Sequence, residues 1–255
     1  MLDSNRVNHG SAGGSAGRGG RSLTVQRNAL ESNEVIAKKN KAIFGRAFVM
    51  NFLSSPGSGK TSLLESIAPV LKSEGLRAAV IEGDVETDLD KQRIDNLGIP
   101  AYQIITNGTC HLDAKMVNGS LGNLDIKDAD VIFIENVGNL VCPTSFNLGE
   151  DMKVVVLSIT EGDDKPLKYP AAFYKSKVMV INKMDLLPVL DSDIAKIKEN
   201  ALSINKDLII FETSCKKKPD GGVGNKGIED LVSFIKEKVK LKAEEFRKIG
   251  GNMYF

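Results

Sequence analysis

One segment is the strongest indication of the fold class: Ala47-Phe48-Val49-Met50-Asn51-Phe52-Leu53-Ser54-Ser55-Pro56-Gly57-Ser58-Gly59-Lys60-Thr61-Ser62. It reads as a buried strand, a glycine-rich turn and the start of a helix. In a phosphate-binding loop of this kind, backbone N–H groups point at the α- and β-phosphates. The lysine ammonium reaches the β- and γ-phosphates, and the threonine hydroxyl joins the Mg²⁺ shell. The predicted nucleoside triphosphate site contains Ser55, Pro56, Gly57, Ser58, Gly59, Lys60, Thr61 and Ser62.

One position departs from the usual pattern G-x-x-x-x-G-K-[ST], because Ser54 stands where the first glycine is expected. Serine is small, so we expect the loop to form and the nucleotide to bind, with any effect falling on the turnover rate. The alternative is an ordinary glycine turn. The preceding strand and Gly57 favour the phosphate loop over that alternative.

A second motif indicates which base the site reads. The apolar run Val178-Met179-Val180-Ile181 ends in Asn182-Lys183-Met184-Asp185. In the arrangement N-K-x-D, the aspartate carboxylate accepts hydrogen bonds from guanine N1–H and from the 2-amino group, and adenine offers neither donor. A buried acceptor that the wrong base leaves unpaired supports discrimination of roughly 10⁴-fold. The motif therefore favours GTP over ATP, and the alternative is a polar turn after a strand.

Each residue of this second motif has an expected place. We expect Lys183 to lie along the plane of the base, and Asn182 to tie this loop back to the phosphate loop. We also assign Ser214 and Cys215, which follow the last predicted strand, to the nucleotide site. The motif disfavours an ATP-dependent small-molecule kinase.

Length and composition fit a compact enzyme and exclude several other classes. The 255 residues are 42% hydrophobic, which suffices for one α/β domain with terminal extensions. The net charge is +1, so electrostatics give no reason to expect nucleic acid as a partner. No apolar run approaches the roughly 18 residues that a membrane span needs, and three cysteines do not indicate a disulfide scaffold. We expect a protein of the reducing cytoplasm.

Strand-like and helix-like segments alternate along most of the chain. This alternation predicts a doubly wound, mainly parallel sheet, the α/β fold of a P-loop GTPase domain, with ligands at the carboxyl ends of the strands. The predicted strands are residues 47–53, 77–82, 100–105, 130–135, 153–159, 177–181 and 207–212. The predicted helices are residues 60–73, 86–97, 112–121, 165–174, 191–204 and 227–245.

We expect four parts along the chain. Residues 1–22 are expected to form a flexible Gly/Ser-rich tail, because their composition cannot build a core. Residues 23–46 are expected to form an N-terminal amphipathic helix packed beside the main domain. Its apolar positions are Leu30, Val35, Ile36, Ala37, Ile43 and Phe44. The P-loop GTPase domain is expected over residues 47–245, followed by a C-terminal tail over 246–255.

Acidic residues end two further predicted strands. Asp84 ends the run Val80-Ile81-Glu82-Gly83-Asp84, and Glu135 follows the run Val131-Ile132-Phe133-Ile134. Carboxylates at such strand ends face the γ-phosphate and Mg²⁺, directly or through water, and can orient the attacking water. We assign Thr61 and Asp84 to Mg²⁺, and the turn of residues 135–138 to sensing the γ-phosphate. The alternative for Asp84 is a helix N-cap. The predicted catalytic residues are Lys60, Thr61, Asp84 and Glu135.

Soft metal ligands are few, but three of them are close in the chain. Cys110 and His111 are adjacent, and Cys142 follows shortly after the turn of residues 135–139. A thiolate beside an imidazole, with a second thiolate reachable across one crossover unit, suits Zn²⁺, Ni²⁺ or copper rather than Mg²⁺. The alternative is an ordinary buried structural cysteine, and the spacing alone does not decide between the two interpretations.

Three segments together resemble one known family. They are Gly108-Thr109-Cys110-His111-Leu112-Asp113-Ala114-Lys115-Met116-Val117, Glu135-Asn136-Val137-Gly138-Asn139-Leu140-Val141-Cys142-Pro143 and Asn182-Lys183-Met184-Asp185-Leu186-Leu187-Pro188. With these segments the chain resembles the HypB hydrogenase nickel-incorporation GTPases over about residues 28–240. The related urease nickel chaperone GTPases carry different segments at these places.

The resemblance implies a GTP-hydrolysing metallochaperone that assists nickel insertion into [NiFe] hydrogenase. It implies a homodimer promoted by GTP and metal, with nickel or zinc bound by Cys110, His111 and Cys142 near the subunit interface. The implied cofactors are GTP or GDP, Mg²⁺, and Ni²⁺ or Zn²⁺. The implied partners are a small zinc- and nickel-binding maturation protein and the precursor of the hydrogenase large subunit.

Two alternatives and one departure accompany this resemblance. The protein could instead be a GTP-controlled dimerising protein with a structural zinc site, or a nickel chaperone that serves another nickel enzyme such as urease. Many relatives carry a histidine-rich or cysteine-containing N-terminal segment. Here the N-terminal tail contains only His9 and no cysteine, so we do not expect nickel storage.

Overall fold

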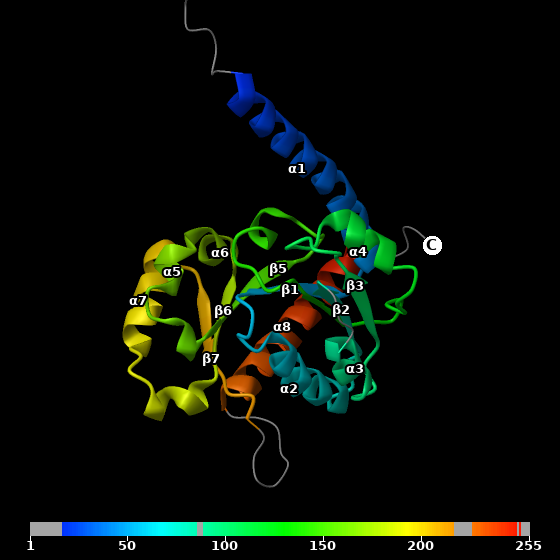
Figure 1. Cartoon of the computed structure of the whole chain (residues 1–255). Helices are drawn as coiled ribbons and strands as arrows, with labels where there is room; N and C mark the ends of the chain where they lie inside the picture. The colour runs from blue at the N-terminus through cyan, green and yellow to red at the C-terminus, as the bar shows by residue number, and fades with distance from the viewer. Residues whose placement is uncertain (1–16, 86–88, 217–225, 249, 251–255) are drawn as a thin grey trace, which may run out of the picture.

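The computed structural model describes residues 17–85, 89–216, 226–248 and 250. Within them, a sheet of seven strands lies between two layers of helices (Figure 1). The strand order is β3-β2-β4-β1-β5-β6-β7, and every pair of neighbouring strands is parallel. The strands are β1 Phe48–Ser54, β2 Ala78–Asp84, β3 Ala101–Ile105, β4 Val131–Glu135, β5 Met152–Ser158, β6 Val178–Asn182 and β7 Ile209–Glu212. The predicted doubly wound parallel sheet is confirmed.

Helices cover both faces of this sheet, which explains why the strands are nearly continuous apolar runs. Helices α2 Lys60–Ser73, α3 Leu89–Asp95 and α8 Lys226–Lys248 pack on the face that carries Met50 and Phe133. The end of α1 Gly17–Phe44 and helix α4 Ala114–Ser120 pack on the face that carries Val49 and Ile132. Helices α6 Pro170–Lys175 and α7 Ile194–Ile204 extend that second layer over β5 and β6.

The strand order brings the loop after β1 beside the loop after β4, and it places the loop after β6 at the same edge of the sheet, with β5 between β1 and β6. From β1 the chain runs out to β2 and β3, returns to β4, and then crosses β1 to reach β5. The loops after β1, β2 and β4 therefore meet at one edge of the sheet, beside the point where the strand order reverses. Ligands of open α/β sheets bind at such a point.

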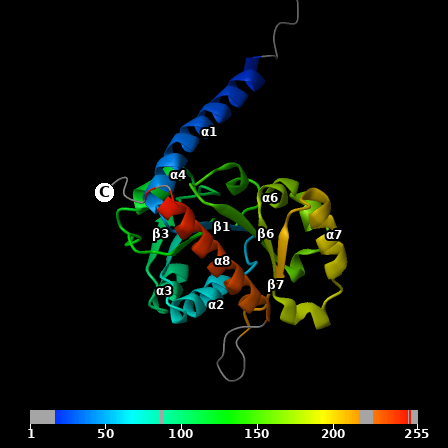
Figure 2. The same ribbon diagram turned by 180° about the vertical axis from the view of Figure 1, so that it is seen from behind.

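Helix α1 differs from its expected form in two ways. It begins at Gly17 rather than at residue 23, so part of the predicted tail is helical; residues 1–16 lie outside the described chain. Its N-terminal part extends away from the sheet, and its C-terminal part lies beside α4 (Figures 1 and 2). The expected apolar face is wrong at Val35 and Ile43, which are 58% and 52% exposed. The buried face consists of Asn33, Ala37, Asn40 and Phe44.

Caps and prolines explain the remaining differences from the predicted helices. Asp113 caps α4 by accepting a hydrogen bond from Met116 N at 2.8 Å, and Asp193 caps α7 in the same way from Lys196 N at 3.1 Å. The predicted helix 165–174 is divided at Tyr169 into α5 Lys165–Lys168 and α6, since Pro170 has no N–H to continue the helix. Short 3₁₀ turns complete the fold: η1 Pro143–Ser145, η2 Ile159–Glu161 and η3 Met184–Val189.

Among the described residues, no helix combines the length and the apolar character that crossing a bilayer requires.

Candidate functional site

The phosphate loop runs from the end of β1 into the first turn of α2. Gly59 precedes that helix with φ of 92°, a conformation that glycine adopts without strain. A Cβ at this position would lie 2.6 Å from Asn182 Nδ2, so the close approach of this loop to β6 requires glycine. The Ser58 hydroxyl is hydrogen-bonded to the Ser55 carbonyl at 2.8 Å and to Glu161 Oε1 at 2.6 Å. These contacts fix the loop so that the N-terminus of α2 faces the adjoining cavity.

Ser54, the departure from the usual loop pattern, contacts the lysine of the loop. Lys60 Nζ donates a hydrogen bond to Ser54 Oγ at 2.9 Å and lies 3.9 Å from Glu135 Oε1. The Ser54 hydroxyl in turn donates to the Ser55 carbonyl at 2.6 Å. Serine is therefore accommodated without distortion of the loop, and it provides an acceptor for the ammonium group.

A cavity of about 540 Å³ opens in front of this loop. It brings together five of the predicted catalytic or base-side residues, which come from four different segments: Lys60, Thr61, Asp84, Glu135 and Lys183. Pro56, Gly57, Gly59 and Ser62 of the predicted loop also line it. The predicted site residues outside its lining are Ser55, Ser58, Asn182, Asp185, Ser214 and Cys215. Residues 86–88, between Asp84 and α3, lie outside the described chain.

The carboxylates of this cavity differ in their partners. The Thr61 hydroxyl donates to Glu135 Oε1 at 2.9 Å, while Glu135 Oε2 is buried and has no hydrogen-bond partner among the residues that the structure describes. Burial raises the pKa of Glu135 to about 7, against the opposite influence of Lys60 and Thr61. Asp84 is half-buried, and its Oδ1 accepts a hydrogen bond from Val85 N at 2.6 Å. Oxygen donors gathered beside a lysine and a threonine hydroxyl fit a nucleotide-bound Mg²⁺.

The predictions missed three charged residues of this cavity. Glu82, Asp90 and Arg93 line it together with the predicted residues. Glu82 carried a readable signal, because a carboxylate inside the apolar run of β2 is unusual unless it has a partner or a function. Asp90 and Arg93 gave no such signal, since charged residues on an amphipathic helix are ordinary.

The predicted tie between the two nucleotide motifs is present. Asn182 Nδ2 donates to the Ser58 carbonyl at 3.1 Å, and Lys183 Nζ donates to the Gly57 carbonyl at 2.7 Å. Thr213 and Cys215 both bond to Asn182 Oδ1, at 3.1 and 3.4 Å. Asn182 is thereby fixed from both sides, and it connects β6, the segment after β7 and the phosphate loop.

Asp185 differs from the buried acceptor that the motif predicted. It lies in η3 and is exposed, and its Oδ1 accepts a hydrogen bond from the Ser214 hydroxyl at 2.6 Å. Ser214 therefore contacts the aspartate of the N-K-x-D motif, and Cys215 contacts its asparagine. Neither residue lines the phosphate cavity.

The side chains of Cys110, His111 and Cys142 lie together, which their spacing in the sequence alone did not establish. The ligand atoms of Cys110, His111 and Cys142 all lie within 4.8 Å of one another, with Cys110 exposed and the other two half-buried. The ring of Phe146 stacks on His111 with centroids 4.1 Å apart, which fixes the orientation of the imidazole. Burial lowers the pKa of His111, although Asp113 opposes this, and the neutral imidazole is the form that binds metals.

The metal cluster and the nucleotide cavity share one turn of the chain. Asn136 Oδ1 accepts a hydrogen bond from Leu112 N at 3.0 Å, so the residue after Glu135 holds the segment that carries Cys110 and His111. Asn139 forms an antiparallel bridge with Ser54 at the start of the phosphate loop. Its side chain accepts hydrogen bonds from Val141 N at 2.7 Å and Cys142 N at 3.4 Å. Residues 135–142 therefore contact both sites.

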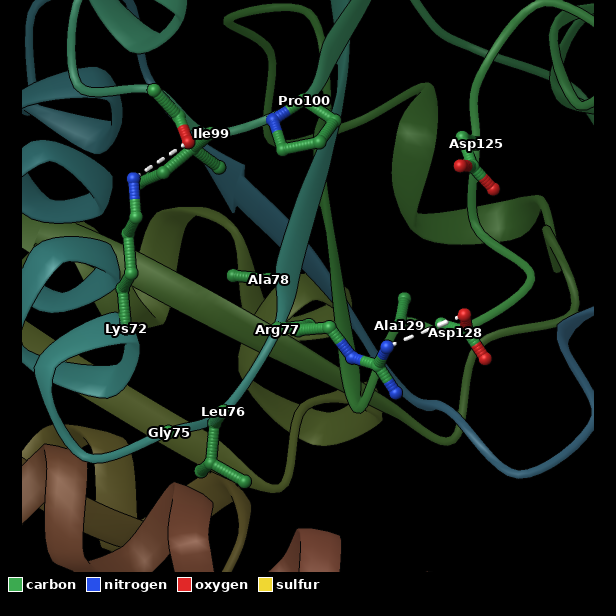
Figure 3. Close-up of a pocket in the computed structure, with 11 residues that line it drawn as sticks. Lys72, Gly75, Leu76, Arg77, Ala78, Ile99, Pro100, Asp125, Asp128 and Ala129 are labelled. Atoms are coloured by element: carbon green, nitrogen blue, oxygen red, sulfur yellow. Dashed lines mark hydrogen bonds and ion pairs between the residues drawn. The ribbon is translucent and has the colours of Figure 1, made fainter.

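A second cavity, of about 380 Å³, lies at the opposite edge of the sheet, where β2 and β3 begin (Figure 3). Its cationic side chains already have partners. Lys72 Nζ donates to the Gly98 carbonyl at 2.9 Å, and the Arg77 guanidinium is 3.3 Å from Asp128. Both cations of this cavity are thus engaged by protein groups, and it lies at the opposite edge of the sheet from the residues described above.

Comparison with known proteins agrees with this geometry. The sequence model described as CobW/HypB/UreG, nucleotide-binding domain, matches residues 48–212, from β1 to the end of β7. The chain belongs to this family. Its nucleotide-binding domain thus coincides with the sheet that carries both nucleotide motifs.

Relatives within the CobW/HypB/UreG family include two named HypB proteins. The hydrogenase maturation factor HypB of Azotobacter vinelandii is 48% identical over 200 residues, which cover 77% of this chain and 65% of that protein. The hydrogenase/urease maturation factor HypB of Helicobacter pylori (strain J99) is 37% identical over 222 residues, covering 85% of this chain and 88% of that protein. The chain therefore spans just under two thirds of the length of the first relative.

A solved structure of the same family has the same fold. The crystal structure of HypB from Helicobacter pylori in complex with nickel superposes with a TM-score of 0.75 at 37% identity. The match covers 83% of this chain and 97% of that one. The likeness thus extends over most of both chains.

Proposed function

We propose that this protein is a GTP-hydrolysing metallochaperone that binds nickel, or zinc, and assists nickel insertion into [NiFe] hydrogenase. The observation that carries this proposal is the convergence of Cys110, His111 and Cys142 beside the turn that also lines the phosphate cavity. The names of the HypB relatives, and the nickel in one of their structures, support the same function. Nickel is here the cargo, and GTP is the reactant.

The residues of the phosphate cavity have distinct roles in hydrolysis. Lys60 neutralises charge on the β- and γ-phosphates, and the backbone N–H groups of the loop bind the phosphate oxygens. Thr61 and Asp84 supply oxygen ligands to Mg²⁺, which offsets the phosphate charge when bound. Glu135, next to the Thr61 hydroxyl, is the carboxylate placed to orient the attacking water. Asp185 reads guanine, and Ser214 supports its carboxylate.

Among the residues that the structure describes, the cargo site has fewer ligands than a metal ion needs. Cys110, His111 and Cys142 supply three ligands, and a tetrahedral ion needs a fourth. Water or a residue of a second copy can complete the shell, so we place the metal at or near the interface of a homodimer promoted by GTP and metal. The proposed partners are a small zinc- and nickel-binding maturation protein and the precursor of the hydrogenase large subunit. The three cysteines are all free, in keeping with a reducing cytoplasm.

A second recipient of the nickel is urease. The observation that favours it is the Helicobacter pylori relative, which is named a hydrogenase/urease maturation factor. Nickel-loaded protein mixed separately with a hydrogenase large-subunit precursor and with urease apoprotein would show which of the two gains nickel in the presence of GTP.

Lys60→Ala tests the enzymatic part of the proposal. We expect GTP hydrolysis to fall by about 10²-fold or more, because the cation that stabilises phosphate charge is removed. The fold should survive, since Lys60 bonds to Ser54 and Glu135 rather than to the apolar core. The measurement is phosphate release, with circular dichroism as a check of folding and Lys196→Ala, at an exposed lysine outside the cavity, as a control for the loss of one lysine. Normal turnover in Lys60→Ala would overturn the phosphate-loop assignment.

A further inference from the structure

Glu82 is a buried carboxylate that no neighbour satisfies. It lies in β2, its side chain is 2% exposed, and neither of its two oxygens has a hydrogen-bond partner among the described residues. A buried carboxylate without partners is unfavourable for folding, and such groups in folded proteins call for an explanation. Glu82 lines the nucleotide cavity, so a ligand in that cavity can provide the missing partners.

The sheet register places Glu82 directly beside Glu135. The two residues are register partners on neighbouring parallel strands, and both follow side chains that face α2, Val80 on one strand and Phe133 on the other. Glu135 Oε1 is occupied by Thr61, whereas its Oε2 is unpartnered, like both oxygens of Glu82. Three buried acceptor atoms therefore lie at the same level of the sheet, at the edge of the nucleotide cavity.

The cations of the cavity are already engaged by other groups. Lys60 Nζ donates to Ser54 and lies near Glu135. Arg93 bonds through Nη2 to Glu65 at 2.6 Å and through Nη1 to Asp90 at 2.8 Å. Lys183 donates to the Gly57 carbonyl, and among the described residues no cation is hydrogen-bonded to Glu82. A cation that balances the ionised form of Glu82 would therefore come with a ligand.

The position of Glu82 along β2 indicates what kind of contact it makes. Glu82 precedes Asp84 by two residues, about 7 Å along a strand, and both point to the same face. Asp84 and Thr61 are the residues that would hold Mg²⁺, so Glu82 is one same-face strand position away from a ligand of that ion. Water bound to the ion would supply the hydrogen-bond donors that the oxygens of Glu82 lack among the described residues.

We propose that Glu82 is a positioning residue for the hydrated Mg²⁺ of the nucleotide. It accepts hydrogen bonds from metal-bound water, together with Glu135, and thereby fixes the ion relative to Thr61 and the phosphates. This inference rests on the proposed GTP chemistry and extends it to a residue that touches neither nucleotide nor metal. In this role the buried acceptors of Glu82 are satisfied only when Mg²⁺–nucleotide is bound.

Glu82→Gln tests the proposal, because glutamine keeps the shape of the side chain but removes the charge. We expect the Mg²⁺ concentration that gives half-maximal GTP hydrolysis to rise by about 10- to 100-fold, with kcat partly recovered at high Mg²⁺. GDP affinity should fall in the presence of Mg²⁺ and stay at the wild-type value in EDTA. Glu82→Asp keeps the charge on a shorter side chain. Its Mg²⁺ requirement and its GDP affinity should therefore lie between those of the wild type and those of Glu82→Gln.

The matched control is Glu150→Gln, a buried carboxylate paired with Lys153 outside the nucleotide cavity. It should leave the Mg²⁺ dependence unchanged. A wild-type Mg²⁺ dependence in Glu82→Gln, or an equal loss of GDP affinity with and without Mg²⁺, would overturn the inference and leave Glu82 a structural residue. GDP affinity reports on Glu82 even if the wild type proves unable to hydrolyse GTP, so the failure of the proposed function is distinguishable from the failure of this inference.

Discussion

The buried charged residues of the nucleotide cavity differ in whether neighbouring protein groups stabilise their charge. Lys60 and Glu135 are close enough to offset each other, and Thr61 gives Glu135 a hydrogen bond. Glu82 has no comparable partner, and its acidic neighbours Glu135, Asp90 and Asp84 oppose its ionisation. Such a residue is expected to lower the stability of the nucleotide-free protein, and a bound cation is expected to offset this destabilisation.

Glu82→Gln should therefore stabilise the nucleotide-free protein, and more so at high pH. Burial, with Glu135 as the second cause, raises the pKa of Glu82 from its ordinary value of 4.5 to about 8. Between these two values the folded state binds more protons than the unfolded state, so the wild type loses stability as the pH rises through this window. Glutamine does not titrate. Thermal melts in EDTA at about pH 5 and about pH 9 should show a stability difference that grows with pH; a constant difference would contradict the argument.

Asp185→Asn should weaken GTP binding by about tenfold or more and shift preference toward xanthosine triphosphate. The amide can donate to the 2-carbonyl of xanthine, but it cannot accept two hydrogen bonds from guanine. Competition binding with the two nucleotides measures the shift. Asp191→Asn, at an exposed aspartate outside the motif, is the matched control. An unchanged preference for GTP would mean that another residue reads the base.

Sequence reasoning located the residues that follow a motif and missed those that depend on packing. Lys60, Thr61 and Glu135 were predicted because a loop pattern or a strand end fixes where they point, and the structure brings them together. Glu82 is recognisable in the sequence as a carboxylate inside an apolar run, but its pairing with Glu135 was missed because no local pattern reveals the register of β2 against β4. The exposure of Asp185 likewise depends on η3 and on the segment after β7.

Among the secondary-structure elements, α1 shows how a polar face can dock a helix. Asn40 is fully buried, and its amide donates to the carbonyls of Ala114 and Leu148 at 2.8 and 3.0 Å, while its Oδ1 accepts from Asn118 at 2.8 Å. Asn33 Oδ1 accepts a hydrogen bond from Ala114 N at 2.8 Å. A Cβ on Gly149 would lie 2.7 Å from a carbonyl of α1, so this loop approaches the helix backbone closely. Helix α1 thus holds the segment that follows His111.

Asn40→Ala should destabilise the protein by about 2 to 4 kcal/mol, because it leaves two buried carbonyls and one amide without their partner. The lower denaturant midpoint in urea would measure this loss. Val35→Ala is the matched control on the same helix, since Val35 is exposed and its truncation should change stability by less than about 0.5 kcal/mol. Equal midpoints for the two variants would show that α1 is not held by its asparagines.

The elements that the sequence predicted best are the strands, and the physical reason is their burial on both faces. A run such as Val131-Ile132-Phe133-Ile134 has no other stable place in a soluble fold, so its ends follow the apolar residues closely. The observed helix ends differ from the predicted ones because caps such as Asp113 and prolines such as Pro170 determine where a helix begins or ends. The docking face of α1 was predicted wrongly because apolar periodicity cannot reveal a face built on satisfied asparagines.

Across the whole molecule, one short segment connects the two sites. The turn of residues 135–142 begins at Glu135 in the nucleotide cavity and ends at Cys142 in the metal cluster. Asn136 holds the backbone of Leu112, and Asn139 joins Ser54 to the backbone of Cys142. A movement of this turn on γ-phosphate binding would therefore shift Cys142 relative to Cys110 and change the geometry offered to the metal.

By linkage, a nucleotide that changes metal affinity must itself be bound more or less tightly when metal is present, by the same factor. The prediction for the wild type is thus a difference in nickel and zinc affinity between the GDP and GTP-analogue states. Without such a difference, the contacts of Asn136 and Asn139 would serve only to stabilise the fold.

Cys142→Ala tests the connection between the metal cluster and the nucleotide cavity. It should lose metal affinity by about tenfold or more, together with the dependence of that affinity on nucleotide, because one of three ligands is removed. It should keep GTP binding, since Lys60, Asn182 and Asp185 are unchanged. Cys215→Ala is the matched control, because that thiol contacts Asn182 and lies outside the metal cluster. Nickel and zinc titrations of the wild type and Cys142→Ala in both nucleotide states provide the test. Equal affinities in all four samples would contradict a coupled site and make Cys110, His111 and Cys142 ordinary structural residues.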